Sequence, residues 1–222
     1  MSNFPGIQKS SNKINYYQQS LDEINEIKKK GIRPTLLLHA CCAPCATFPL
    51  EFLNEIFDCT ILYNNSNIYP SDEYLRRLNE LKQYLSYINK QNTHQIHLIE
   101  VPYDNESYTK KLEPLKDYPE GSQRCFTCYT LRMHEAYQYA QDHHFDYFTT
   151  VMTISRQKDS QKLNEIGTAL QKQFPNVKYF HSDFKKKQGI DRGRELSNQY
   201  NLYRQQYCGC IYSYEEYLKR KV

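Results

Sequence analysis

The chain has 222 residues, of which 39% are hydrophobic and 24% are charged, and its formal net charge at pH 7 is +4. This composition is ordinary for one globular domain and argues against a small secreted disulfide scaffold, while the mild positive charge permits an anionic partner without requiring one. The sequence shows neither an apolar signal segment at its start nor an apolar run long enough to cross a bilayer, so we expect a cytoplasmic protein without membrane contact.

Predicted strands and helices alternate along the chain. The first helix is amphipathic and Gly31 ends it, and Ser71 or Asp72 can cap the third helix. The predicted elements are, in chain order, a helix at 13–30, a strand at 35–40, a helix at 47–57, a strand at 59–64, a helix from 71 to about 90, a strand at 94–103, a helix and a loop within 105–122, a helix at 123–143, a strand at 145–152, a helix at 158–172, a strand at 177–184 and a final helix at about 191–200.

This alternation predicts βαβ units and therefore an α/β fold. We expect residues 35–222 to form a single domain with an open, mostly parallel sheet and helices on both faces. Residues 1–34 form an N-terminal helical leader in this interpretation.

Seven of the eight cysteines lie in three short motifs. HACCAPC (39–45) directly follows the first predicted strand, RCFTC (124–128) lies where a helix begins, and YCGC (207–210) comes after the last predicted helix. Ligands bind at the carboxyl edge of an open α/β sheet, and the N-terminus of a helix favours thiolates. We expect the three motifs to meet at one edge of the sheet.

Three kinds of chemistry could use these thiols. A structural zinc site needs four ligands and leaves three clustered cysteines without a role. A dithiol oxidoreductase needs a single Cys-x-x-Cys pair. An iron–sulfur site takes about four thiolates from short spacings and distant loops, and further thiols can serve a second redox or metal centre. The number of cysteines favours the iron–sulfur site but leaves zinc and thiol exchange open.

Five segments of the sequence resemble the QueH-type epoxyqueuosine reductases, which do not use cobalamin. The segments are, in order, LLLHACCAPC, YNNSNIYPSDEYLRR, RCFTCYTLRM, FTTVMTISRQKDS and LYRQQYCGCIYS. The resemblance runs from residue 35 to residue 214. It implies a fold of the PP-loop and alpha-hydrolase-like type, and a [4Fe-4S] cluster beside a second redox centre or metal ion such as iron. It also implies the reduction of epoxyqueuosine to queuosine at the wobble position of tRNA, with electrons from a donor that the sequence does not identify.

Cys41, Cys42, Cys125 and Cys128 are the predicted cluster ligands. The first two are neighbours on a strand-to-helix turn, and the other two lie at the start of a helix. A rival division takes one cluster ligand from each of the first and third motifs, because adjacent side chains diverge.

Cys208 and Cys210 are predicted to act in catalysis. The glycine between them lets the backbone aim both sulfurs at one point, where they can form a second iron site or close to a strained, easily reduced disulfide. Removal of an epoxide oxygen needs two electrons and two protons, and a cluster passes one electron at a time, so a neighbouring centre is useful. Cys45 is a possible ligand of this second centre, since some relatives carry Asp at its place and both side chains bind metals.

Basic residues near the motifs are candidates for contacts with RNA. Arg124, Arg156, Lys158 and Arg204 are the predicted substrate-binding residues, because Lys and Arg neutralise phosphates, and the 21 tyrosines offer stacking partners for unpaired bases. For any one of these basic residues, a solvated surface position is the simpler explanation. The competing function is a zinc-stabilised RNA-binding module without catalysis.

Overall fold

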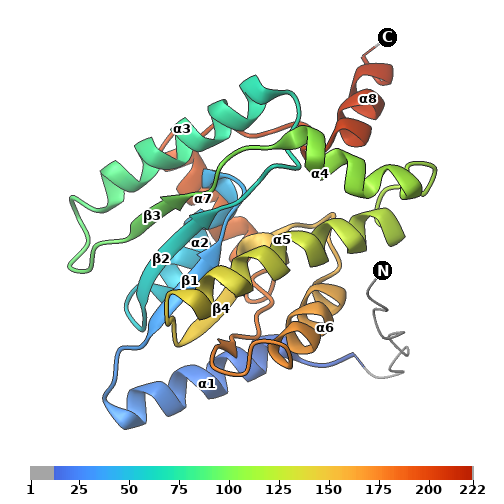
Figure 1. The fold of residues 1–222 in the computed structure, drawn as a ribbon. Helices are drawn as coiled ribbons and strands as arrows, with labels where there is room; N and C mark the ends of the chain where they lie inside the picture. Colours follow the sequence, from blue (N-terminus) through green and yellow to red (C-terminus); the bar gives the residue numbers. More distant parts are fainter. Residues whose placement is uncertain (1–12, 222) are drawn as a thin grey trace.

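Five parallel strands form the centre of the molecule, and helices cover both faces of the sheet (Figure 1). The computed structural model describes residues 13–221, so the first twelve residues of the predicted leader lie outside the described residues. The strands, in the spatial order β3-β2-β1-β4-β5, are β1 (Thr35–His39), β2 (Asp58–Tyr63), β3 (His97–Glu100), β4 (Tyr147–Thr150) and β5 (Lys178–Tyr179).

The helices follow the strands in a regular alternation. Within residues 13–221 the α-helices are α1 (Tyr16–Lys30), α2 (Ala43–Leu53), α3 (Ser71–Ile88), α4 (Asn105–Leu112), α5 (Gln123–Asp142), α6 (Ser160–Gln171), α7 (Gly189–Gln199) and α8 (Ile211–Lys219). Two short 3-10 helices follow α4 and β4, at Glu113–Leu115 and Val151–Ile154. This single α/β domain with a parallel sheet confirms the predicted fold class and is consistent with the PP-loop and alpha-hydrolase-like type.

The central strand β1 packs against a different set of helices on each face. Leu36 and Leu38 lie in one hydrophobic core with side chains of α1, α2 and α3, whereas Leu37 lies in the other core with side chains of α5 and α6. Such an uninterrupted apolar strand is typical of a parallel sheet that is covered on both faces. Ile24 and Ile27 of α1 belong to the first core, so α1 packs with the sheet, and a division of the chain at residue 34 stays a prediction.

The strand order reverses between β1 and β4. From β1 the chain proceeds outward to β2 and β3, and it then crosses to β4 on the other side of β1. In open α/β sheets, ligands bind outside the carboxyl ends of the strands at such a switch point. His39 at the end of β1 pairs with Thr150 at the end of β4, so the segments that follow these two residues begin side by side.

Helix α2 begins four residues earlier than the sequence analysis predicted. It starts at Ala43, within the first cysteine motif, and Pro44 occupies its first turn. Proline suits this position because its missing amide hydrogen would have no partner there and its φ angle is already helical. Cys45 is therefore part of a helix rather than of a loop.

The prediction that the chain's last helix ends near residue 200 was wrong. Helix α8 follows the third cysteine motif, and its only buried residue is Ser213. Its sequence nevertheless places Ile211, Tyr214 and Leu218 at helical spacing, so this helix could have been predicted from the sequence.

Two further details differ from the prediction. Pro70 occupies the N-cap position of α3 without a side-chain hydrogen bond, so Ser71 and Asp72 lie in the first turn instead of capping it. The fifth strand ends early because Ser182 donates its backbone amide to the Asn164 side chain rather than to a neighbouring strand. No helix within residues 13–221 is both long and apolar enough to cross a membrane.

Candidate metal centre

All three cysteine motifs lie at the N-terminal ends of helices. Cys42 is the N-cap residue of α2, Cys125 lies in the first turn of α5, and Cys210 is the N-cap residue of α8. The free amides and the dipole at a helix start stabilise negative charge, but burial opposes this effect and raises the pKa of all three thiols. The fold thus places one cysteine of each motif at a helix start.

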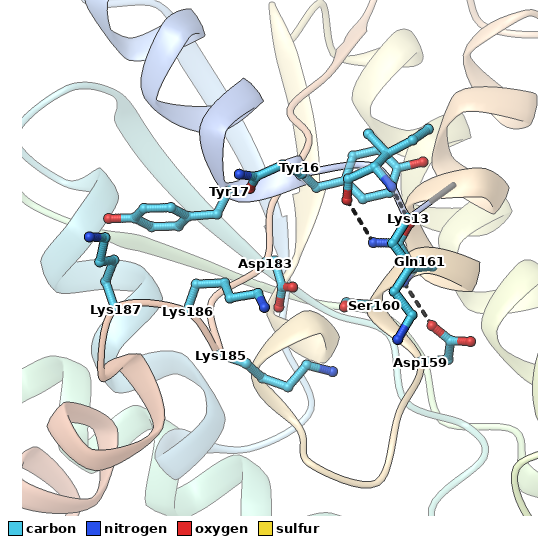
Figure 2. Close-up of a pocket in the computed structure, with 12 residues that line it drawn as sticks. Lys13, Tyr16, Tyr17, Asp159, Ser160, Gln161, Asp183, Lys185, Lys186 and Lys187 are labelled. Carbon is cyan, nitrogen blue, oxygen red and sulfur yellow. Dashed lines mark hydrogen bonds between the residues drawn. The ribbon is translucent and has the colours of Figure 1, made fainter. Parts of the chain in front are cut away.

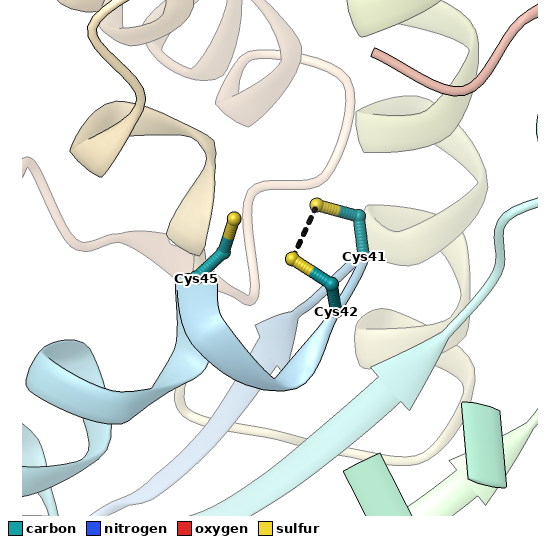
Figure 3. Close-up of side chains that lie close together, drawn as sticks. All are labelled: Cys41, Cys42 and Cys45. Carbon is teal, nitrogen blue, oxygen red and sulfur yellow. Dashed lines mark hydrogen bonds between the residues drawn. The ribbon is translucent and has the colours of Figure 1, made fainter. Parts of the chain in front are cut away.

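Cys41, Cys42 and Cys45 form a compact group on the turn from β1 into α2 (Figure 3). Their sulfur atoms all lie within 4.8 Å of one another, and the sulfurs of Cys41 and Cys42 are 3.9 Å apart. Since metal–thiolate bonds of about 2.3 Å in tetrahedral geometry place two sulfurs about 3.8 Å apart, these three side chains could bind one metal ion.

Gln205 approaches this group from the loop that follows α7. Its side-chain amide lies 3.2 Å from the sulfur of Cys42 and 3.7 Å from that of Cys45, and it donates to both. The third motif begins only two residues later, so the loop joins the first group of thiols to the third.

The remaining four clustered cysteines surround the starts of α5 and α8. The backbone amide of Gly121 donates to the sulfur of Cys125 at 3.2 Å, and the Tyr108 hydroxyl donates to that of Cys128 at 3.3 Å. Burial raises the pKa of Cys125, and it raises the pKa of Cys210 to about 11, with the charge of nearby Cys208 adding to both shifts. These four residues therefore act on one another electrostatically.

A pocket of about 170 Å³ lies between the first and third motifs. Cys41 and Cys45 line it from the β1–α2 turn, Cys208 from the third motif, and Lys158 from the segment that follows β4. Of the three motifs that were predicted to meet at one edge of the sheet, the first and the third thus share a pocket, whereas Cys125 and Cys128 of the second do not line it.

Three cations surround the thiols. The side chains of Arg77 and Arg132 have relative exposures of 1% and 2%, and Lys158 is half-buried. Arg77 forms an ion pair with Glu73, whereas neither Arg132 nor Lys158 has a carboxylate partner among residues 13–221. A buried cation without a carboxylate is costly unless other negative charge lies nearby. In this molecule, the thiolates are the groups that can supply it.

The shifts in pKa agree with this charge balance. Burial by itself would lower the pKa of Arg132 and of Lys158. The negative charge of Cys128 near Arg132, and that of Cys208 near Lys158, instead raises both pKa values above their ordinary values. The pKa of Cys41 lies well below that of an ordinary thiol, because the thiols of Cys42 and Cys45 hydrogen-bond to its sulfur and Lys158 and Arg132 add positive charge. Cys41 is thus the sulfur of this group that ionises most readily.

His39 lies beneath the thiols and is uncharged. Its ring nitrogen Nδ1 is 2.8 Å from the Thr150 hydroxyl, and burial, with Arg132 nearby, lowers its pKa to about 3. Its contact with Thr150 joins the carboxyl ends of β1 and β4.

The predicted substrate-binding residues lie in different environments. Arg156 and Arg204, with Arg194, line a pocket of about 240 Å³ that also contains Cys45. Lys158 lines the thiol pocket. Arg124 is buried, donates to the carbonyl of Lys116 and lies 4.4 Å from the ring centre of Tyr212 in α8.

A larger pocket lies elsewhere, between the start of α1 and residues 183–187 (Figure 2). It has a volume of about 800 Å³, and its lining residues include Lys185, Lys186 and Lys187 but none of the cysteines. Lys185 donates to the carbonyls of Ser155 and Lys158, two residues that also line the thiol pocket. Lys185 thus holds the segment 155–158 in place from the side of the larger pocket. The candidate site is therefore identified by its clustered thiols and nearby cations, not by the volume of its pocket.

Two residues that contact the thiol motifs, Arg77 and Gln205, were not predicted from the sequence. Arg77 is buried although arginine is usually exposed, and Gln205 has no distinctive sequence context. One signal was present: Glu73 and Arg77 are four residues apart in a predicted helix, the spacing of an ion pair. Nothing in that spacing indicates that the pair is buried.

Comparison with known proteins agrees with the resemblance of the five sequence segments. A family model described as epoxyqueuosine reductase QueH matches residues 36–216. "Epoxyqueuosine reductase QueH" of Staphylococcus aureus is 41% identical over 212 residues, which are 94% of this chain and 88% of the relative. Proteins of the same name are 39% identical in Streptococcus pyogenes (90% of this chain, 78% of the relative) and 29% identical in Thermotoga maritima (81% and 90%). The chain therefore belongs to the epoxyqueuosine reductase QueH family.

Proposed function

We propose that this protein reduces epoxyqueuosine to queuosine at the wobble position of tRNA, in the cytoplasm. One observation carries the proposal beyond family membership. Cysteines from two distant segments, Cys41, Cys45 and Cys208, line one pocket together with Lys158, and neither Lys158 nor the nearby buried Arg132 has a carboxylate partner among residues 13–221. Such an arrangement suits a redox centre made of thiolates.

The donor set fits a [4Fe-4S] cluster together with a second metal ion. Seven thiols exceed the four that a cluster needs, and the excess negative charge has cations to balance it. When bound, a cluster supplies electrons one at a time at low potential. A structural zinc site would use four of these cysteines and leave the others, and the cations beside them, without a function.

The assignment of cysteines to the two centres follows the motif spacing. In our proposal Cys41, Cys42, Cys125 and Cys128 hold the cluster, and Cys208 and Cys210 form the second centre with Cys45 as a possible further ligand. The compact Cys41–Cys42–Cys45 group supports a second arrangement, in which these three sulfurs hold a single ion and the other four hold the cluster.

The reaction needs defined contributions from the chain. The epoxide loses its oxygen as water and becomes an alkene by taking up two electrons and two protons. Lys158 places a positive charge on the wall of the pocket, where it can bind the departing oxygen. Arg156 and Arg204, in the adjoining pocket, bind phosphates of the tRNA anticodon loop.

The test is turnover by the anaerobically purified protein, with dithionite as a chemical reductant in place of the unidentified donor. Epoxyqueuosine-containing tRNA is the substrate, and nucleoside analysis of the digested tRNA measures queuosine. We expect queuosine to form, and we expect iron with acid-labile sulfide in the protein. A colourless protein with one zinc per chain that binds the tRNA without forming queuosine would instead establish the RNA-binding module.

A further inference from the structure

The Cys208-Gly209-Cys210 motif is held by a buried side chain from a distant helix. Arg77, in α3, donates from Nη1 to the carbonyl of Cys208 at 3.1 Å and from Nη2 to that of Tyr207 at 3.2 Å. Its Nε donates to Glu73 at 2.7 Å. One guanidinium thus binds two successive carbonyls of the motif and a carboxylate.

The carboxylate is fixed in turn by a second contact. The Tyr203 hydroxyl donates to Glu73 at 3.1 Å, so α3 and the loop before α8 share a buried Arg77–Glu73–Tyr203 network. Arg77 and Glu73 have side-chain exposures of 1% and 9%. Because the Arg77 and Glu73 charges are buried, breaking their ion pair would leave each charge without a partner, which is costly.

Gly209 shows how closely this network fits the motif. A Cβ atom at Gly209 would lie 3.2 Å from Nη1 of Arg77 and 3.2 Å from Ile68, and the φ angle of Gly209 is +133°. The backbone amide of Tyr69 donates to the Gly209 carbonyl at 2.7 Å, and the Tyr207 hydroxyl donates to the Tyr69 carbonyl at 2.6 Å. The turn that precedes α3 therefore packs against the motif as tightly as Arg77 does.

These contacts give a role to a conspicuous sequence segment. YPSDEYLRR (69–77) contains Tyr69, Glu73 and Arg77 but no thiol and no group that reaches the pocket. We propose that Arg77 is the positioning residue of the Cys-Gly-Cys motif, and that the Arg77–Glu73–Tyr203 network sets the direction in which Cys208 and Cys210 present their sulfurs. This inference rests on the proposed function, in which both sulfurs are needed for turnover.

Arginine is required here for geometric reasons. Its planar fork binds three acceptors in fixed directions, whereas the single ammonium group of lysine cannot bind the Glu73 carboxylate and both carbonyls in the same geometry. Arg77→Lys therefore keeps the positive charge but loses the fixed directions of the three hydrogen bonds. Mutation of a residue that orients a metal ligand typically lowers activity or metal affinity about 10- to 100-fold.

The experiment compares Arg77→Lys with the wild-type protein, both purified anaerobically with their metals. We expect turnover of epoxyqueuosine-containing tRNA to fall about 10- to 100-fold, with KM for the tRNA changed less than about twofold. We also expect iodoacetamide to alkylate Cys208 and Cys210 faster than in the wild type, as mapped by mass spectrometry. The alkylation of Cys41, Cys42 and Cys45 should not change.

Asn89→Ala is the matched control. Asn89 caps the opposite end of α3, and its side chain makes two hydrogen bonds with the backbone of Ile96, at 2.9 and 3.0 Å. The variant therefore destabilises the same helix without touching the motif. It should leave turnover and the alkylation of Cys208 and Cys210 at wild-type values below its melting temperature.

Three results would overturn the inference. Arg77→Lys could show wild-type turnover and alkylation, or its loss could be no greater than that of Asn89→Ala. If Arg77→Lys fails to fold, Tyr203→Phe replaces it as the test, because this variant removes one hydrogen bond from Glu73. We expect Tyr203→Phe to speed the alkylation of Cys208 and Cys210 to a smaller extent. Unchanged alkylation in this variant would contradict the proposal. Absence of queuosine with the wild-type protein would instead refute the proposed function.

Discussion

The cysteines and the cations beside them form one electrostatic unit at the scale of single residues. Arg132 and Lys158 lack carboxylate partners within residues 13–221, and the pKa of Cys41 is lowered well below the ordinary thiol value. A thiol must lose its proton to bind a metal, so positive charge placed beside it favours binding before any metal arrives. The same charges would otherwise destabilise the fold.

Acid-labile sulfide separates the two possible assignments of the cysteines, because a single metal ion brings none. We expect Cys125→Ala and Cys128→Ala to lose sulfide, and Cys208→Ser and Cys210→Ser to keep it while both lose turnover. Cys59→Ala is the control, since Cys59 is fully buried in β2 away from the three motifs.

The alternative arrangement gives the opposite pattern. If Cys125, Cys128, Cys208 and Cys210 together hold the cluster, the Cys208 and Cys210 variants lose sulfide, whereas Cys41→Ala keeps it and loses iron only. Full turnover by either Cys208→Ser or Cys210→Ser would contradict the catalytic role of this motif under both arrangements.

Lys158 should affect turnover through its charge. Lys158→Met removes the positive charge from the pocket wall, and we expect turnover to fall on the order of 100-fold, the usual effect of removing one preorganised electrostatic contact. Lys158→Arg should recover part of the activity. Turnover is referred to the sulfide content of each variant, because Lys158 also lowers the pKa of Cys41, and a Lys158→Met protein with normal turnover would exclude the role.

Helix starts and close helix–sheet contacts decide the geometry at the scale of elements. The starts of α2, α5 and α8 carry the motifs, and the position of each start depends on how the helix packs behind it. For α6, which follows the segment containing Lys158, the closest contact is at Gly167. A Cβ atom there would overlap the ring of Tyr179, which is 1% exposed in β5.

Gly167→Ala should therefore destabilise the protein even though alanine favours helices. Overpacking costs about 1–3 kcal/mol, and the gain in helix propensity of about 1 kcal/mol offsets only part of it. Chemical denaturation measures the change. In a Tyr179→Leu background the cost of Gly167→Ala should shrink, because the overlapping ring is absent; equal costs in both backgrounds would show that the ring is not the cause.

At the scale of the whole molecule, α1 is joined to the far edge of the sheet by one carboxylate. Glu23 accepts hydrogen bonds from Lys178 at 2.5 and 2.6 Å and from the Tyr147 hydroxyl at 2.5 Å, and so it connects α1 with β4 and β5. Burial would raise the pKa of Glu23, but these hydrogen bonds and the charge of Lys178 lower it overall.

This shift predicts a dependence of stability on pH. A carboxylate whose pKa is lower in the folded state stabilises the protein above its unfolded pKa of about 4.3 and loses that contribution as the pH falls through the folded value. Relative to Glu23→Gln, the wild-type protein should be more stable by about 0.5–1 kcal/mol at pH 7. The difference should shrink below about pH 4, and a difference that stays constant from pH 7 to pH 3 would contradict the assignment.

The sequence by itself determined the class of fold and the family, and it located the three cysteine motifs. Alternating apolar runs and amphipathic segments predict a parallel sheet because they reflect which side chains avoid water, a property of each segment alone. The cysteine motifs were recognisable for a similar reason, since the short spacings within each motif are local. The resemblance to the QueH family was confirmed by the comparisons.

Only the tertiary structure decided which distant groups meet. Arg77 and Cys208 are 131 residues apart, and Gln205 and Cys42 are 163 apart, so no local pattern relates them. Helix α8 was not predicted although Ile211, Tyr214 and Leu218 have helical spacing, and its place beside α5 depends on distant contacts such as that of Tyr212 with Arg124. The identity of the thiols is a local property of the chain, but their orientation and charge balance come from packing between elements that are remote in sequence.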